Sequence, residues 1–240
     1  MKKSEFTRGL IDGIPICLGY LSVSFAFGIF AVQNGLSFIE AILVSMTNVT
    51  SAGQLAGVPI IATGGSFIGL AASQFIINLR YSLMSVILSQ KLDKNVTLID
   101  RLVLSFVNTD EVFAVAAGQH GDVKKSYMYG LIITPYLGWS VGTAIGAVCG
   151  NILPVIVTSA LGVAIYGMFI AIVTPEMKKN KAVAICVLLA VALSCLFAFV
   201  PVLKSVETGF VVIICSVAAS ALLAVLAPIE MHGEEPNIDG

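Results

Sequence analysis

The chain has 240 residues, of which 58% are hydrophobic and only 11% are charged. Soluble globular domains carry roughly 25% charged residues, so a chain this poor in charge cannot cover a water-facing surface. The net charge of −1 provides no basic patch, which argues against a nucleic-acid-binding protein. We therefore expect an integral membrane protein.

The apolar stretches predict an all-α integral membrane protein with about eight transmembrane segments, because about 20 apolar helical residues cross a bilayer core of about 30 Å. In chain order the segments are 11–32, 38–61, 66–90, 102–119, 127–149, 152–173, 182–203 and 207–228. The first run is too long for a signal peptide, so we interpret it as a retained span. The count falls to seven if one of the weaker segments is re-entrant.

Residues 1–229 are predicted to form a single transmembrane transporter domain, and residues 230–240 an acidic polar tail. A faint internal repeat relates about 10–95 to about 100–180, through short matches at offsets of 88 and 85 residues. Repeats in opposite orientations are typical of many secondary transporters. An inverted repeat is therefore one interpretation of this chain.

Lys and Arg in the loops predict an N-terminus on the cytoplasmic side. With eight spans, the cytoplasmic loops hold eight basic residues: Lys2, Lys3, Arg8, Lys124, Lys125, Lys178, Lys179 and Lys181. The outer loops then hold four: Lys91, Lys94, Arg101 and Lys204.

A polar run interrupts the second segment, from Thr47 to Gln54, and it includes Ser51 and Gly53. An unwound helix can present backbone N–H and C=O groups to a substrate where it lines a cavity. The alternative is a small-residue face for close helix packing. Gln54 is too large for that role, which favours a binding site.

Arg80 lies about midway along the third segment, where an arginine costs roughly 2.5–3.5 kcal/mol. It should face protein, water or an anionic ligand; the alternative is an ion pair that only locks two helices together. A polar stripe on the same helix does not include Arg80. The stripe consists of Gln74, Asn78, Tyr81 and Ser85. The sequence leaves open whether the stripe or the arginine lines a pathway.

Asp110 and Glu111 lie near the middle of the fourth segment. Asn108 and Thr109 directly before them favour a helix break, since their side chains offer the backbone alternative hydrogen bonds. One arginine cannot neutralise two carboxylates, so the surplus acid should hold a proton part of the time. A proton-coupled carrier requires such a group, although a passive buried acid would behave alike.

The sequence predicts no metal site, no cofactor and no enzymatic activity. The five cysteines are scattered singly, without metal-ligand spacing. Walker, GxSxG and HExxH motifs are absent, which also argues against an ATP-driven pump.

Several of these positions resemble the AzlC family of bacterial branched-chain amino acid exporters. The similar residues include Gly9 to Pro15, Gly19-Tyr20, Phe25 to Gly28, Ser51 to Gln54, Asn78 to Arg80 and Thr109 to Ala114. The resemblance runs from about Gly9 to Lys178, but residues 161–169 lack an acid and a proline that the family often has. It implies a small AzlD-type membrane subunit as partner, and the bacterial cytoplasmic membrane as location.

We therefore predict a secondary exporter of hydrophobic, branched-chain amino acids that is coupled to protons. The expected substrate-binding or coupling residues are Arg80, Asp110, Glu111, Asn78, Gly53, Gln54, Ser51 and Thr109. Arg80 or backbone N–H groups near Gly53 would hold the substrate carboxylate, and Asp110 or Glu111 would hold the ammonium or carry the proton. The alternatives are a non-transporting scaffold subunit and a transporter of another small solute.

Overall fold

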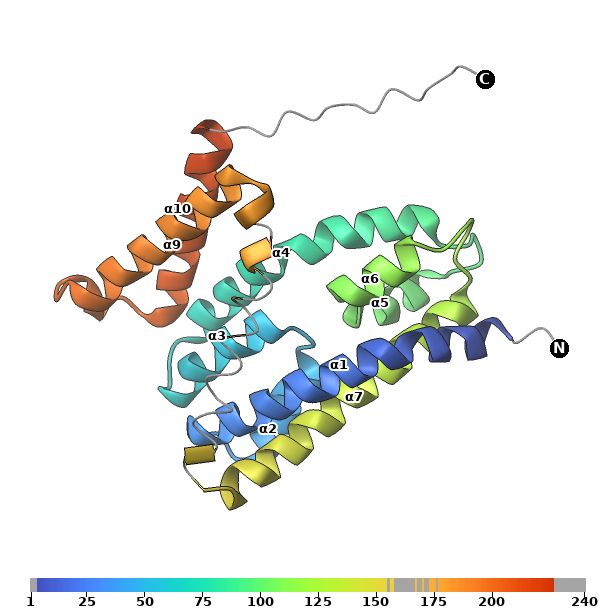
Figure 1. Ribbon diagram of the computed structural model, residues 1–240, viewed down its shortest axis with the longest axis horizontal. Helices are drawn as coiled ribbons and strands as arrows, with labels where there is room; N and C mark the ends of the chain where they lie inside the picture. Colours follow the sequence, from blue (N-terminus) through green and yellow to red (C-terminus); the bar gives the residue numbers. More distant parts are fainter. Residues whose placement is uncertain are drawn as a thin grey trace. The chain divides into compact units, whose positions relative to one another are not determined.

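A computed structural model describes residues 4–154, 156–157, 167, 170, 173–175 and 177–226 (Figure 1). Within these residues the chain is helical and has no strand. Five of the helices are long and apolar enough to cross a membrane: α1 (Glu5–Gln33), α4 (Phe67–Lys91), α7 (Lys125–Ile152), α9 (Lys181–Phe199) and α10 (Thr208–Leu226). The expected all-α membrane protein is confirmed. The chain divides into two compact units, residues 1–169 and 170–240.

Two of the expected segments are discontinuous helices, as the polar residues in them predicted. The segment 38–61 consists of α2 (Phe38–Thr47) and α3 (Ser51–Ala62), with the break at residues 48–50. The segment 102–119 consists of α5 (Leu98–Phe106) and α6 (Asp110–Ala117), with the break at residues 107–109. The expected segment 152–173 and the acidic tail lie largely outside the described residues.

Several helix ends of the first unit meet at one end, which we call the N-terminal end because α1 begins there. Glu5 of α1 lies 3.9 Å (Oε1 to Nζ) from Lys124, which precedes α7. Val123 donates a backbone hydrogen bond of 2.8 Å to Lys91 at the end of α4. The Lys91 ammonium also donates to the carbonyl of Ala117 at the end of α6. The starts of α1 and α7 and the ends of α4 and α6 therefore share this end.

The C-terminal ends of α1 and α7 lie together at the opposite end of the first unit. Gly150 near the end of α7 contacts Val32 near the end of α1. Short turns at this end connect α1 to α2 and α3 to α4. They contain Gly35 (φ 93°) and Gly64 (φ 67°), whose left-handed backbone a residue with a Cβ rarely adopts.

Each pair of short helices forms a hairpin, which we interpret as re-entrant because each helix is about half as long as a membrane span. The first hairpin (α2 and α3) enters and leaves at the opposite end, and the second hairpin (α5 and α6) enters and leaves at the N-terminal end. Both tips reach the middle of the long helices. Tyr81 of α4 donates to the hydroxyl of Thr50 in the first tip at 3.2 Å. Tyr136 of α7 donates to the carbonyl of Met46 at 3.1 Å, and its ring centroid lies 6.3 Å from that of Phe106 in the second hairpin.

The two hairpins correct one expectation about the loops. If segments 38–61 and 102–119 crossed the bilayer, the loop with Lys91, Lys94 and Arg101 would lie on the other side from Lys124. Because both segments turn back, α4 runs from the opposite end to the N-terminal end. This basic loop therefore lies on the same side as the start of α1 and Lys124.

Helices α1 and α7 run side by side in the same direction, with backbone against backbone (Figure 1). A Cβ built on Gly9 would lie 2.1 Å from the carbonyl oxygen of Tyr127, and one built on Gly146 would lie 2.0 Å from that of Phe25. Gly138, Gly142, Gly146 and Gly150 recur every four residues along the contact face of α7. Such small-residue spacing lets two membrane helices approach closely.

The second unit contains α9, α10 and the short helix η1 (Leu203–Ser205), which lies in the connection between them. Helix α9 packs against α10, and none of its residues is fully buried. Both long helices match the expected spans 182–203 and 207–228.

Candidate functional site

Three cavities follow one face of α4 and include the predicted polar stripe. The larger cavity, of about 350 Å³, is lined by Gln74 and Asn78. The tip cavity, of about 160 Å³, lies between the two hairpin tips and is lined by Asn78 and Tyr81. The third cavity, of about 310 Å³, is lined by Ser85. Asn78 borders the first two, and Asn108 of the second hairpin borders the last two. Every residue of the stripe thus faces a cavity.

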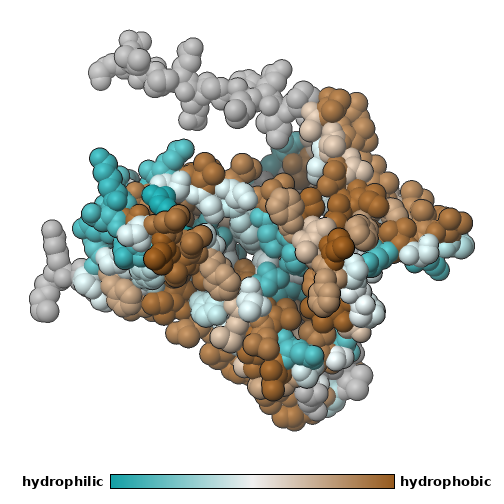
Figure 2. Space-filling view, turned by 180° about the vertical axis from the view of Figure 1, so that it is seen from behind, coloured by the Kyte–Doolittle hydropathy of each residue, from teal (hydrophilic) through white to brown (hydrophobic). Residues whose placement is uncertain are grey.

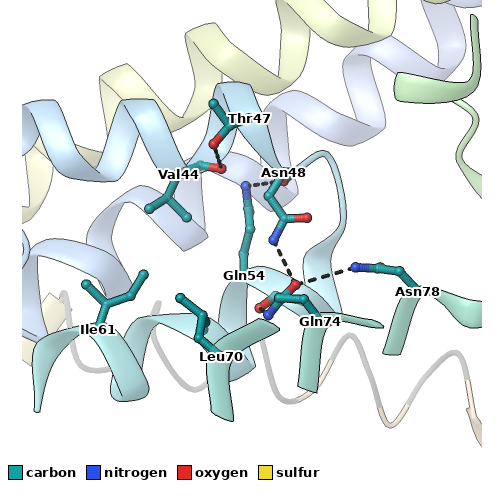
Figure 3. A pocket seen from close by; sticks show the side chains of 10 residues that line it. Val44, Thr47, Asn48, Gln54, Ile61, Leu70, Gln74 and Asn78 are labelled. Carbon is teal, nitrogen blue, oxygen red and sulfur yellow. Dashed lines mark hydrogen bonds between the residues drawn. The ribbon is translucent and has the colours of Figure 1, made fainter. Parts of the chain in front are cut away.

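An amide network joins the first hairpin to α4 beside the larger cavity (Figure 3). Gln74 donates from Nε2 to the backbone carbonyl of Gly53 at 2.8 Å, which fixes the orientation of its amide. Its Oε1 must then accept, and it receives the side-chain N–H groups of Asn48 at 3.0 Å and Asn78 at 3.4 Å. Gln54 donates from Nε2 to the carbonyl of Asn48 at 2.8 Å.

Within this network, these donor assignments leave two buried amide oxygens without a partner among the described residues: Gln54 Oε1 and Asn78 Oδ1. Gln54 is fully buried, and both Gln54 and Asn78 line the larger cavity. A buried acceptor without a donor costs about 1–3 kcal/mol. Because both residues line the larger cavity, their amide oxygens are candidates to accept hydrogen bonds from a ligand.

The N-terminus of α3 lies at the same place and carries no cap. Thr50 precedes the helix, but no side chain of the described residues caps its first N–H groups, which belong to Ser51, Ala52 and Gly53. The helix dipole and these N–H groups favour a negative charge. The start of α6 differs, because Thr109 caps it at 3.5 Å and its first turn already carries two carboxylates.

Arg80 and Asp110 form an ion pair between α4 and α6, with Nη1 and Oδ2 2.6 Å apart. The guanidinium of Arg80 also lies over the ring of Tyr81 and donates a hydrogen bond to the Tyr81 hydroxyl at 3.1 Å. Both ionic side chains are about half exposed in the isolated chain. The arginine therefore lies beside the tip cavity, but Tyr81 rather than Arg80 lines it.

Glu111 contacts a different helix from Asp110. Its carboxylate accepts a hydrogen bond from the hydroxyl of Tyr20 on α1. The Tyr20 ring packs edge-on against Trp139 of α7, with ring centroids 5.1 Å apart. The two neighbouring acids thus point to different partners, as their 100° separation on a helix requires.

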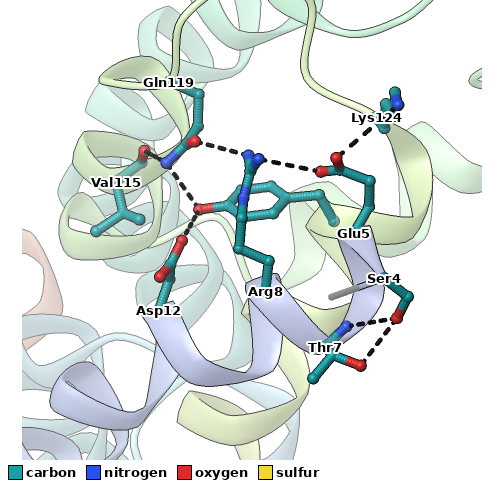
Figure 4. A network of polar contacts seen from close by, with 9 residues as sticks. Ser4, Glu5, Thr7, Arg8, Asp12, Val115, Gln119 and Lys124 are labelled. Atoms are coloured by element: carbon teal, nitrogen blue, oxygen red, sulfur yellow. Dashed lines mark hydrogen bonds and ion pairs between the residues drawn. The ribbon is translucent and has the colours of Figure 1, made fainter. Parts of the chain in front are cut away.

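The N-terminal end has a second polar network, which the sequence did not predict (Figure 4). Tyr127 donates to Asp12 at 2.7 Å and accepts from Gln119 at 2.9 Å, and Gln119 accepts from Arg8 at 2.8 Å. Hydrophilic side chains gather at this end of the surface (Figure 2). The network ties the end of the second hairpin to α1 and α7.

Asp100 connects the start of the second hairpin to α7 through hydrogen bonds. It accepts from Lys125 and Tyr129 at 2.8 Å each, and its hydrogen bonds with Thr97 form a capping box at the start of α5. The Lys125 ammonium and the Thr97 donors hold the pKa of the Asp100 carboxyl well below its ordinary value.

The structure separates the predicted site residues into two groups. Asn78, Gly53 and Gln54 meet at the larger cavity, and Ser51 lies at the start of α3 beside them. Arg80, Asp110, Glu111 and Thr109 lie at or near the start of the second hairpin's returning helix. Two features of the site were not predicted from the sequence: Gly57 as a lining residue, and the side-chain oxygen of Asn108, which has no partner among the described residues. Neither follows from residue type or spacing alone.

The fold and this arrangement define a polytopic membrane protein in which two polar helix breaks meet inside an apolar bundle. The chain belongs to the AzlC family, whose family model, described as AzlC protein, matches residues 15–153. The resemblance seen in the sequence is thereby confirmed.

Relatives of the chain are membrane proteins. An uncharacterized membrane protein of Archaeoglobus fulgidus is 32% identical over 74% of this chain and 78% of its own length. Inner membrane protein YgaZ of Escherichia coli K12 is 27% identical over 80% of this chain and 81% of its own length. An uncharacterized membrane protein of Helicobacter pylori is 24% identical over 61% of this chain and 67% of its own length. No solved structure matches the chain.

Proposed function

We propose that the protein is a secondary exporter of hydrophobic, branched-chain amino acids in the bacterial cytoplasmic membrane. The observation that carries this proposal is the meeting of two re-entrant hairpins at the middle of α4, beside cavities that follow the polar stripe. Irregular backbone at membrane depth is tolerated where it lines a cavity or is buried in protein. Discontinuous helices near the midplane form the substrate sites of many transporters.

The larger cavity suits a small zwitterion. Its volume of about 350 Å³ lies at the lower end of the roughly 300–1,000 Å³ that is usual for ligand pockets. The uncapped start of α3 binds the substrate carboxylate, and Gln54 Oε1 and Asn78 Oδ1 accept from its ammonium group. The backbone N–H groups are preferred to Arg80 for the carboxylate, because Asp110 already neutralises the guanidinium.

Glu111 is the candidate for the coupling proton. Arg80 pairs with Asp110, so Glu111 is the surplus acid of the three charges, and its observed partner is the neutral hydroxyl of Tyr20. Ionisable side chains at membrane depth often mark proton relays in transporters, which supports this role for Glu111.

The distribution of basic residues supports a cytoplasmic N-terminus. The described part of the N-terminal end holds Arg8, Lys91, Lys94, Arg101, Lys124 and Lys125. The turns at residues 34–37 and 63–66, at the opposite end, contain neither lysine nor arginine. By the positive-inside rule, this distribution favours a cytoplasmic location for the N-terminal end.

Counterflow of radiolabelled leucine in proteoliposomes tests the proposed function. The purified chain is reconstituted with and without a small AzlD-type subunit, which the family resemblance implies as a partner. We expect exchange of leucine in at least one of the two preparations, and net movement that responds to a pH gradient. Glu111→Gln should retain exchange but lose the response to the pH gradient.

Two results would contradict the proposal. A protein that is folded in both preparations but moves no amino acid would support a scaffold subunit or a carrier of another solute. A response to the pH gradient that survives in Glu111→Gln would remove Glu111 from the coupling step.

A further inference from the structure

We infer that one end of the larger cavity is a side-chain pocket in which Gly57 and Leu70 set the size of the amino acid that is accepted. This inference rests on the proposed function and adds a specificity site to it. On this inference the pocket prefers an aliphatic side chain of branched-chain size to an aromatic one.

The order of residues on two helices gives the cavity a polar end and an apolar end. Gly53, Gly57 and Ile61 follow one face of α3 at intervals of four residues. Leu70 and Gln74 lie opposite them on α4, which runs antiparallel to α3: the Gly53 Cβ position is 2.5 Å from Gln74 Oε1, whereas that of Gly57 is 3.5 Å from Leu70 Cδ1. The amides thus lie near the hairpin tip, and the aliphatic residues lie toward the opposite end.

This polarity fixes the direction of a bound amino acid. Its charged groups lie at the tip, where the start of α3 and the free amide oxygens of Gln54 and Asn78 are found. Ile61 is eight residues, or about 12 Å, along α3 from Gly53. The substrate side chain must therefore extend toward Ile61 and Leu70, and it passes Gly57.

Packing does not require a glycine at position 57. An added Cβ would meet Gln74 Nε2 at 3.4 Å and Leu70 Cδ1 at 3.5 Å, which are ordinary van der Waals contacts. A glycine inside a helix costs about 0.5–1 kcal/mol relative to alanine. The space that a side chain would fill is part of the cavity that Gly57 lines, and the substrate uses it.

Substitutions that narrow the pocket should change selectivity toward smaller substrates. We expect Gly57→Val to lower the rate of leucine counterflow relative to alanine counterflow by about tenfold or more, since one methylene in an apolar pocket changes selectivity by about 10–200-fold. Gly57→Ala should change the same ratio in the same direction, but less. The measurement is the ratio of the two initial rates in proteoliposomes of equal protein content.

A substitution that widens the pocket should act in the opposite direction. Leu70→Ala is expected to raise phenylalanine counterflow relative to leucine. Gly19→Ala is the matched control, because no atom lies within 4 Å of a Cβ at that position on α1, and it should leave both ratios unchanged.

The outcomes separate this inference from the proposed function. A wild-type protein that exchanges no amino acid would remove the proposed function, and the pocket with it. A wild-type protein that exchanges leucine, with unchanged ratios in Gly57→Ala and Leu70→Ala, would overturn the pocket alone. These two variants decide the question even if Gly57→Val does not fold.

Discussion

The sequence identified Arg80 and Asp110 separately, whereas the structure joins them in an ion pair. The sequence indicated a costly arginine and left its partner open; the structure supplies that partner at 2.6 Å. The polar stripe was recognised from spacing alone, and its residues line the cavities. The free oxygens of Gln54 and Asn78 were not predictable, because they follow from a hydrogen-bond network between two helices.

Single and double substitutions of this ion pair distinguish a transport role from a structural one. We expect Arg80→Ala and Asp110→Asn each to abolish leucine efflux in cells, because each removes one of the two charges that the proposed transport needs beside the tip cavity. The double variant should remain inactive. A pair that only locks α4 to α6 would instead show lower stability in each single variant and partial recovery in the double. Membrane expression and thermal unfolding in detergent provide the stability measurement.

At the scale of elements, the helix breaks were predictable but the direction after each break was not. Asn48, Asn108 and Thr109 signalled breaks through their side chains. However, α2 and α5 are about 15 and 14 Å long, and each therefore crosses only about half of a bilayer core of about 30 Å. The helix that follows can then either continue across the bilayer or turn back, and its apolar composition would be the same in both cases. Contacts of the tips with Tyr81 and Tyr136 decide between these alternatives, and they are tertiary.

The glycine face of α7 gives a test at the same scale. A Cβ at Gly146 would lie 2.0 Å from a backbone oxygen of α1, which cannot move away without separating the helices. We expect Gly146→Ala to destabilise the protein by on the order of 1–3 kcal/mol. The nearest atom to a Cβ at Gly150 is instead in the Val32 side chain, at 2.5 Å, and the nearest backbone atom lies 3.2 Å away. Gly150→Ala should therefore lower the temperature of unfolding less, and equal losses would contradict the contact described.

At the scale of the whole molecule, the number of crossings determines which loops share a side. If each apolar segment is counted as a membrane crossing, the loop with Lys94 is predicted to lie on the other side of the membrane from Lys124. Re-entry of both hairpins reverses α4 and brings the two basic loops together. The expected domain 1–229 and the repeats of about 10–95 and 100–180 stay predictions.

Labelling of single cysteines in sealed vesicles tests this arrangement. In a variant without the five native cysteines, we expect Lys94→Cys and Asp122→Cys to react with an impermeant maleimide from the cytoplasmic side. Asn34→Cys and Thr63→Cys should react from the outside. If Lys94→Cys and Asp122→Cys react from different sides, the second hairpin crosses the membrane; if Asn34→Cys and Thr63→Cys do so, the first hairpin crosses it. Either result would contradict the fold described.

The backbone contact between α1 and α7 has a consequence for motion. Two helices whose main chains touch along their length cannot bend apart locally without losing many contacts at once, so they act as a fixed wall. If the protein is the exporter proposed above, a passage would open by movement of the hairpins, one from each end of the first unit. Simultaneous withdrawal of both hairpins would let ions leak and dissipate the gradient. The proposed function therefore requires the two tips to open in turn.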